Sequence, residues 1–231
     1  MPVKIPGKNI AADARQVFEV VRDGGIAVIH VDVGYAVLAH AADAVRRIYA
    51  AKRRSFDKPT GLLGNHALHE MLHILGDRER EMVRRITQDH DLPLAVIAPY
   101  RQDHPLLDTL DPFVRKQAVK NDTLNILLNA GELRNAIADL AIAGATICVG
   151  SSANVSLTGT KYRLEDVDPE IRRIADIETD YGLCAHHNPQ GLSSTMIDFT
   201  TFRVQRAGAC FGRIAEVMRR EFGVELKAPA A

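Results

Sequence analysis

The chain has 231 residues, of which 46% are hydrophobic and 25% charged, as in an ordinary soluble globular protein. Lys and Arg number 29 and so do Asp and Glu, so the formal net charge is zero, which argues against a strongly basic nucleic-acid coat but leaves room for local patches. The three cysteines form no CxxC pair, no apolar run approaches the length of a membrane span, and the N-terminus has no apolar signal region. We therefore expect a cytoplasmic protein that is not inserted in a membrane.

Helical and strand-like segments alternate along the first half of the chain. Apolar spacing and short β-branched runs predict, in chain order, a helix over 9–23, strands at 26–30 and 35–39, a helix over 41–51, a basic turn at 52–59, and helices over 66–75 and 77–88.

The second half continues the alternation. The same signals predict a strand at 93–100, an irregular stretch at 104–117 that contains two prolines, a helix over 131–143, a strand at 145–149, a short helix within 165–175, paired strands at 195–199 and 202–205, and a helix over 214–222. Alternation of this kind predicts the α/β class. Without a repeat or a low-complexity linker, we expect one domain over 1–231, with a core at about 12–212 and a short flexible C-terminal tail.

A basic turn follows the helix over 41–51. Lys52, Arg54 and Lys58 lie within seven residues, and such a group offers a planar guanidinium and two ammonium groups to a polyphosphate. Taken alone, the pattern is more often that of a solvated helix C-terminus whose cations complement the helix dipole.

Two hydroxyl-rich segments follow predicted strands. Gly150-Ser151-Ser152-Ala153-Asn154-Val155-Ser156 comes after the strand at 145–149, where ligands gather in open α/β sheets. Ser193-Ser194-Thr195 enters the strand pair that ends near Arg206-Ala207-Gly208. Each segment can bind phosphate or carboxylate oxygens, and each is also compatible with an ordinary turn or an exposed sheet edge.

Metal-site and nucleotide fingerprints are weak or absent. His66, His69 and His73 share one helical face, but their spacing is not HExxH, so we predict a polar helix face and no metal site. His186-His187 and Cys184 are also left out of a metal site. The chain contains no P-loop and no GxGxxG motif.

The three polar segments in this order resemble the YrdC family of threonylcarbamoyl-AMP synthases. The family pattern of K-x-R…K-P, S-A-N-x-S, S-T-hydrophobic-hydrophobic-D and R-x-G stands here as KRRSFDKP, SANVS, STMID and RAG. The resemblance covers about residues 12–212. It implies an α/β fold with a twisted, open, mixed sheet, flanking helices and a concave, positively charged groove.

The resemblance also implies an activity. Family members are nucleotidyltransferases that convert ATP, bicarbonate and L-threonine to threonylcarbamoyl-AMP and pyrophosphate for tRNA modification. ATP would be a substrate, together with Mg²⁺, and the roles carried over make Lys52 and Arg54 the catalytic residues. The nucleotide- and substrate-binding residues would be Asp32, Tyr35, Lys58, Ser152, Asn154, Ser156, Ser194 and Arg206.

The chain departs from the family on the amino-acid side, which indicates a divergent member. The two threonines of the early P-T-(D/E)-T-x-Y-G-L motif are Val31 and Val33, and a valine forms no hydrogen bond. The R-x-P motif falls near 125–129, where there is no arginine, the P-G-P-x-T motif has no counterpart near 92–96, and Leu157 replaces a glycine. Two alternatives follow: a carbamoyl-adenylate enzyme with another amine or acyl acceptor, or a non-catalytic module that binds double-stranded RNA, tRNA or a nucleotide.

Overall fold

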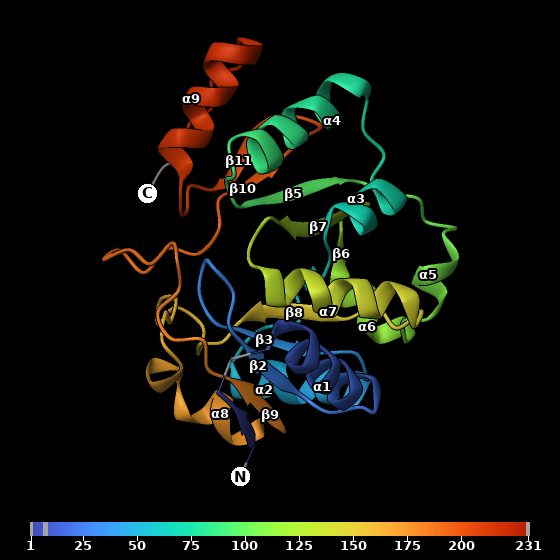
Figure 1. Ribbon diagram of the computed structural model, residues 1–231. Helices are drawn as coiled ribbons and strands as arrows, with labels where there is room; N and C mark the ends of the chain where they lie inside the picture. The colour runs from blue at the N-terminus through green and yellow to red at the C-terminus, as the bar shows by residue number, and fades with distance from the viewer. Residues whose placement is uncertain (1, 7–8, 230–231) are drawn as a thin grey trace.

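An 11-stranded mixed sheet runs through the computed structural model, which describes residues 2–6 and 9–229 (Figure 1). The sheet order is β1 (Val3–Ile5), β9 (Ile177–Thr179), β2 (Ala27–Ile29), β3 (Ala36–Ala39), β8 (Val149–Ser152), β4 (Gly61–Leu62), β7 (Thr123–Leu128), β5 (Leu94–Pro99), β10 (Met196–Asp198) and β11 (Arg203–Arg206), with β6 (Val119–Lys120) beside β7. Parallel and antiparallel pairs alternate irregularly, so the predicted α/β class and mixed sheet are confirmed.

Helices cover both faces of this sheet. α1 (Ile10–Arg22) and α7 (Glu132–Ala143) pack together over one face, while α2 (Ala42–Ala51), α6 (Pro112–Ala118) and α8 (Pro169–Ile174) lie against the other (Figure 1). Each face of the sheet has its own hydrophobic core, and β2 contributes to both because its side chains alternate. Val28 packs on the α2 side, and Ala27 and Ile29 pack on the α1 side. The remaining helices are α3 (His66–Leu72), α4 (Asp77–Arg84), α5 (Pro105–Asp108) and α9 (Phe211–Phe222).

Most predicted elements form, with ends that coincide with the prediction or differ from it by no more than four residues. α1 begins after Asn9, whose side chain accepts a hydrogen bond from the Ala12 amide and so satisfies one free N–H of the first turn. The helix expected over 77–88 is α4 followed by one π-helical turn at Arg85–Asp89, and 165–175 contains a 3-10 turn and α8. The paired strands at the end are β10 and β11, which are antiparallel. In the described part of the chain no helix is both long and apolar enough to cross a bilayer.

The expectation of an irregular stretch at 104–117 is wrong. Two helices form there, α5 and α6, and each has its proline in the first turn. A proline at this position has no amide hydrogen to leave unpaired, and its fixed φ suits the start of a helix. His104 and Asp111 cap the two helices with side-chain hydrogen bonds to Leu106 and Phe113.

The strand expected at 145–149 is displaced, and two central strands, β4 and β7, are missed. β8 begins only at Val149 and includes the Gly-Ser-Ser segment, because these residues pair with β3, Gly150 opposite Leu38 and Ser151 opposite Val37. β7, between β4 and β5, has the burial alternation of a half-buried strand: Leu124, Ile126 and Leu128 are buried, and the residues between them are half-buried. β1, β6 and β9 also lie outside the predicted elements.

Candidate functional site

A pocket with a cavity volume of about 170 Å³ lies over the middle of the sheet, where the two-residue strand β4 joins β8 to β7. Side chains reach it from the turns after β2 and α2, from β7, β8, β10 and β11, and from α7. Three arginines line it, Arg54, Arg134 and Arg206, and within the described residues its lining includes no Asp or Glu. A pocket with cations and no anions of its own is suited to a negatively charged ligand.

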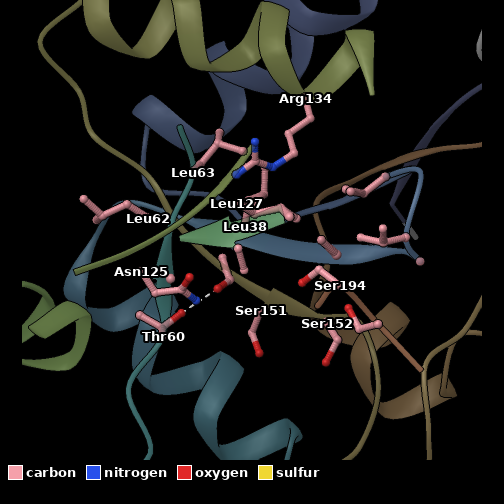
Figure 2. Close-up of a pocket in the computed structure, with 18 of the residues that line it drawn as sticks. Leu38, Thr60, Leu62, Leu63, Asn125, Leu127, Arg134, Ser151, Ser152 and Ser194 are labelled. Carbon is pink, nitrogen blue, oxygen red and sulfur yellow. Dashed lines mark hydrogen bonds between the residues drawn. The ribbon is translucent and has the colours of Figure 1, made fainter. Parts of the chain in front are cut away.

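The pocket has two chemically different ends (Figure 2). The polar end consists of Arg54, Thr60, Ser151, Ser152, Ser194 and Arg206. The apolar end consists of Arg134 and the aliphatic residues that belong to the α1–α7 side of the core, Ile29, Val31, Val33, Leu38, Leu63 and Leu127. Leu38 and Leu127 lie between Arg134 and the hydroxyls of Ser151, Ser152 and Ser194 in this view.

Arg206 and Ser194 are held together at the polar end. The Arg206 guanidinium donates to the Ser194 carbonyl at 2.8 Å and to its Oγ at 2.9 Å, which fixes the arginine against β10. Burial, together with the positive charge of Arg54, lowers the pKa of Arg206. Two guanidinium groups that raise each other's electrostatic energy are stabilised by an anion between them.

Arg54 reaches the same end from the basic turn. Its Nη2 donates to the Pro59 carbonyl at 2.6 Å, and it forms no ion pair among the described residues. The adjacent Arg53 is exposed and is paired with Glu170 at 2.6 Å. The basic turn therefore contains both kinds of cation. Arg53 is solvated, as at an ordinary helix C-terminus, whereas Arg54 faces the pocket, as expected of a phosphate-binding residue.

Lys52 does not line the pocket, although it was expected to contact phosphates. Its side chain is 1% exposed and its ammonium group donates to the carbonyls of Ser152 and, at 2.6 Å, Asn154. It adjoins a smaller cavity that shares Arg54, Thr60 and Ser151 with the pocket wall. Burial, together with repulsion from Arg54, lowers the pKa of Lys52 to about 7, which Asp168 opposes. The contacts of Lys52 are those of a residue that positions the Ser152–Asn154 segment.

The S-A-N-x-S segment divides between the pocket and its support. Ser152, on β8, lines the pocket, whereas Asn154 and Ser156 lie behind it. The Ser156 amide donates to the Lys52 carbonyl, and the Asn154 amide group donates to the Val155 carbonyl. Asn154 Oδ1 and Ser156 Oγ are buried without a partner among the described residues.

The other three predicted site residues differ in their placement. Tyr35 lines the pocket and donates to the Gly182 carbonyl at 3.1 Å, and burial raises its pKa. Asp32 lies outside the pocket lining, and its carboxylate lies against Gly131 at the start of α7. Lys58 is exposed and contributes only its carbonyl, which accepts from Tyr49 at 2.8 Å.

Arg134, Asn125 and Thr60 line the pocket and are absent from the predicted site. Arg134 had a detectable signal: with Ile137, Ala138 and Ala141 it occupies the i, i+3, i+4, i+7 stripe of α7 that faces the core, where a charged residue is unusual. Asn125 interrupts the apolar run of β7, and its Oδ1 is buried without a partner among the described residues. Thr60 Oγ1 donates to the Gly150 carbonyl at 2.7 Å.

The histidine face expected to be polar is buried instead. His69 and His73 are almost inaccessible, their Nδ1 atoms are 2.8 Å apart, and burial lowers their pKa values to about 4 and about 3. Both rings are therefore neutral and share one hydrogen bond. They lie apart from the pocket lining.

Comparison with known proteins identifies the fold. The sequence model of the Sua5, YciO and YrdC proteins, described as "Telomere recombination", matches residues 19–208. Among curated proteins, none matches this chain by sequence.

Solved structures with the same fold span nearly the whole chain. A hypothetical protein from Streptococcus mutans superimposes with a TM-score of 0.81 at 17% identity, over 99% of this chain and 98% of the other. P. abyssi Sua5 in complex with L-threonine has a TM-score of 0.75 at 19% identity over 98% of this chain, which spans 62% of the length of Sua5. Full-length HypF in a phosphate- and nucleotide-bound form has a TM-score of 0.64 at 16% identity, over 89% of this chain and 25% of HypF.

Proposed function

The chain belongs to the Sua5, YciO and YrdC family, and from this premise we propose that it is a nucleotidyltransferase of the threonylcarbamoyl-AMP synthase type. The observation that carries the proposal is a pocket lined by three arginines and, among the described residues, by no carboxylate. The polar end would hold the phosphates of ATP, since guanidinium and hydroxyl groups donate hydrogen bonds to phosphate oxygens. A nucleotide and phosphate bound to HypF, and L-threonine bound to Sua5, support this choice of ligands.

The reaction needs no nucleophilic side chain. An amine and bicarbonate give a carbamate and water, a carbamate oxygen attacks the α-phosphorus of ATP, and pyrophosphate leaves with the electrons of the broken P–O bond. The protein's contribution is to orient the reactants and stabilise the charge on the phosphoryl oxygens. We assign this charge stabilisation to Arg54 and Arg206, with Ser152 and Ser194 as hydroxyl donors.

Lys52 has a positioning role in this proposal. It ties the Ser152 and Asn154 carbonyls together from behind the pocket wall, so it keeps the Ser152 hydroxyl at the polar end. Mg²⁺ would enter with ATP as part of the substrate, coordinated by phosphate oxygens and water, because the described lining of the pocket contains no carboxylate to bind it.

The test is incubation of the protein with ATP, Mg²⁺, bicarbonate and each of the twenty amino acids. Pyrophosphate release and mass spectrometry of the adenylates are the measurements. We expect an amino-acid-dependent carbamoyl-adenylate, which then serves the modification of tRNA. Failure to bind ATP or AMP by calorimetry contradicts the proposal. Salt-dependent binding of double-stranded RNA without pyrophosphate release indicates the non-catalytic module instead.

A further inference from the structure

Arg134 is a buried cation that the protein itself leaves without a counter-charge. Its side chain is 4% exposed, and its only hydrogen-bond acceptor among the described residues is the Gly64 carbonyl. No carboxylate of the described chain lies within ion-pair distance of it. Burial lowers the pKa of Arg134 to about 9, so the group remains charged at neutral pH.

An arrangement of this kind opposes folding. Transfer of a charge from water to a protein interior costs several kcal/mol unless a partner compensates. Leucine or methionine at position 134 would continue the apolar stripe of α7 at no such cost, because Ile137, Ala138 and Ala141 complete that stripe. The guanidinium faces the pocket, so an anionic ligand group is the partner that compensates it (Figure 2).

The side chains around Arg134 indicate the chemistry of the rest of the ligand. The apolar end presents aliphatic side chains and includes no hydroxyl group, and the nearby positions 31 and 33 are both valine. A ligand hydroxyl buried there would lose its hydrogen bonds to water without replacement. Asn125, whose Oδ1 is buried without a partner among the described residues, lies beside Thr60 and not beside Arg134, so it can accept a hydrogen bond from a ligand N–H group that points toward the polar end (Figure 2).

The arginine at this end of the pocket also comes from a different element than in the family pattern. The resemblance places an arginine in the segment 125–129, which forms the end of β7, but here Asn125 and Leu127 face the pocket from that strand. Arg134 reaches the same pocket from α7, the next element along the chain. A positive charge is thus retained at this end of the pocket, in a new position and among hydrocarbon neighbours.

We propose that Arg134 binds the carboxylate of the acceptor, and that the acceptor is an aliphatic α-amino acid without a side-chain hydroxyl, in preference to threonine. The carboxylate would meet the guanidinium, the hydrocarbon side chain would fill the space among Val31, Val33 and Leu127, and the amine would point toward the polar end. This inference rests on the proposed function for the fate of the amine, but the binding of the amino acid is measurable without it.

The experiment is isothermal titration of the intact protein with L-valine, L-threonine and L-valinamide. Valine and threonine have nearly the same shape, and valinamide lacks the carboxylate. We expect valine to bind at least about fivefold more tightly than threonine, since a buried hydroxyl without a partner costs on the order of 1 kcal/mol or more. Valinamide should bind at least about tenfold more weakly than valine, the usual loss for a charged hydrogen bond.

Arg134→Met is the informative variant, with Arg53→Met as a control that loses the same charge from the surface. Arg134→Met should lose valine binding by about 10- to 100-fold and retain AMP binding. Its free energy of unfolding should change little, because removal of the uncompensated charge offsets the loss of the donor to the Gly64 carbonyl. Arg134→Lys should recover part of the valine affinity.

Three results overturn the inference: threonine binding as tightly as valine, Arg134→Met binding valine like the wild type, or Arg134→Met being destabilised by several kcal/mol, as a purely structural role requires. Failure of the proposed function is distinguishable, because it appears as absent AMP binding or absent adenylate while the valine titrations are unaffected.

Discussion

The two ends of the pocket place positive charge in different ways. At the polar end, Arg54 and Arg206 come from a turn and a strand end, and each is held by backbone carbonyls. At the apolar end, Arg134 comes from the first turn of α7, at the start of a buried helical stripe, and lies next to aliphatic side chains. We expect the polar end to accept a range of phosphate ligands. We expect the apolar end to distinguish strongly between ligands, because an ion is stabilised among hydrocarbon side chains only by a well-matched partner. The polar end therefore retains the family pattern, and the apolar end is where this chain differs from it.

The largest effect is expected from Arg206→Met at the polar end. Loss of the guanidinium should weaken AMP and ATP binding by about 10- to 100-fold, since hydrogen bonds to charged groups contribute about 1.5–3 kcal/mol. Calorimetric titration measures it. Arg203→Met, on the same strand but exposed, is the matched control and should bind AMP like the wild type. Equal affinities in the two variants would remove the polar end from the nucleotide site.

Lys52→Met should act on stability more than on binding. The Ser152 and Asn154 carbonyls lose their buried donor, so the free energy of unfolding should fall by about 2 kcal/mol, measured by denaturant titration. Nucleotide affinity should fall less than in Arg206→Met, because the lysine only positions the wall. A loss of affinity larger than that of Arg206→Met, with unchanged stability, would show that Lys52 contacts the nucleotide directly.

Lys52 also predicts a pH dependence. Its pKa falls from 10.5 to about 7 on folding, so the unfolded chain binds more protons than the folded chain between these values. The stability of the wild type relative to Lys52→Met should therefore rise as the pH rises through this window, and it should be constant below it. Denaturation midpoints of both proteins across the window measure the difference. A difference that does not change with pH would contradict the burial of a charged ammonium.

The smallest effect is expected from Val33→Thr at the apolar end. The new hydroxyl offers a hydrogen bond to a threonine side chain, so the preference for valine over threonine should narrow by about threefold to tenfold, the range of one neutral hydrogen bond. Titration with both amino acids measures the ratio. Val155→Thr, outside the pocket lining, is a control of the same chemistry. An unchanged ratio would place threonine's hydroxyl elsewhere.

Local sequence patterns predict most of the helices and strands correctly, but they fail for two kinds of element. α5 and α6 were missed because a proline reads as a helix breaker unless its position at the helix start is recognised. β8 was displaced because Gly150 and Ser151 are poor strand residues by composition, and they become strand residues only through pairing with Leu38 and Val37. Pairing partners far along the chain determine such segments.

The candidate site divides in the same way. By itself the sequence determined the α/β class, the order of most elements, the family resemblance and five residues of the pocket lining, Tyr35, Arg54, Ser152, Ser194 and Arg206. Only the tertiary structure decided that Lys52 and Asn154 support the wall, that Lys58 lies outside it, and that Arg134 enters the pocket. The physical reason is that motifs record which residue types are present, whereas the role of a charge depends on its burial and on the distance to its partners, and both arise only when distant segments pack together.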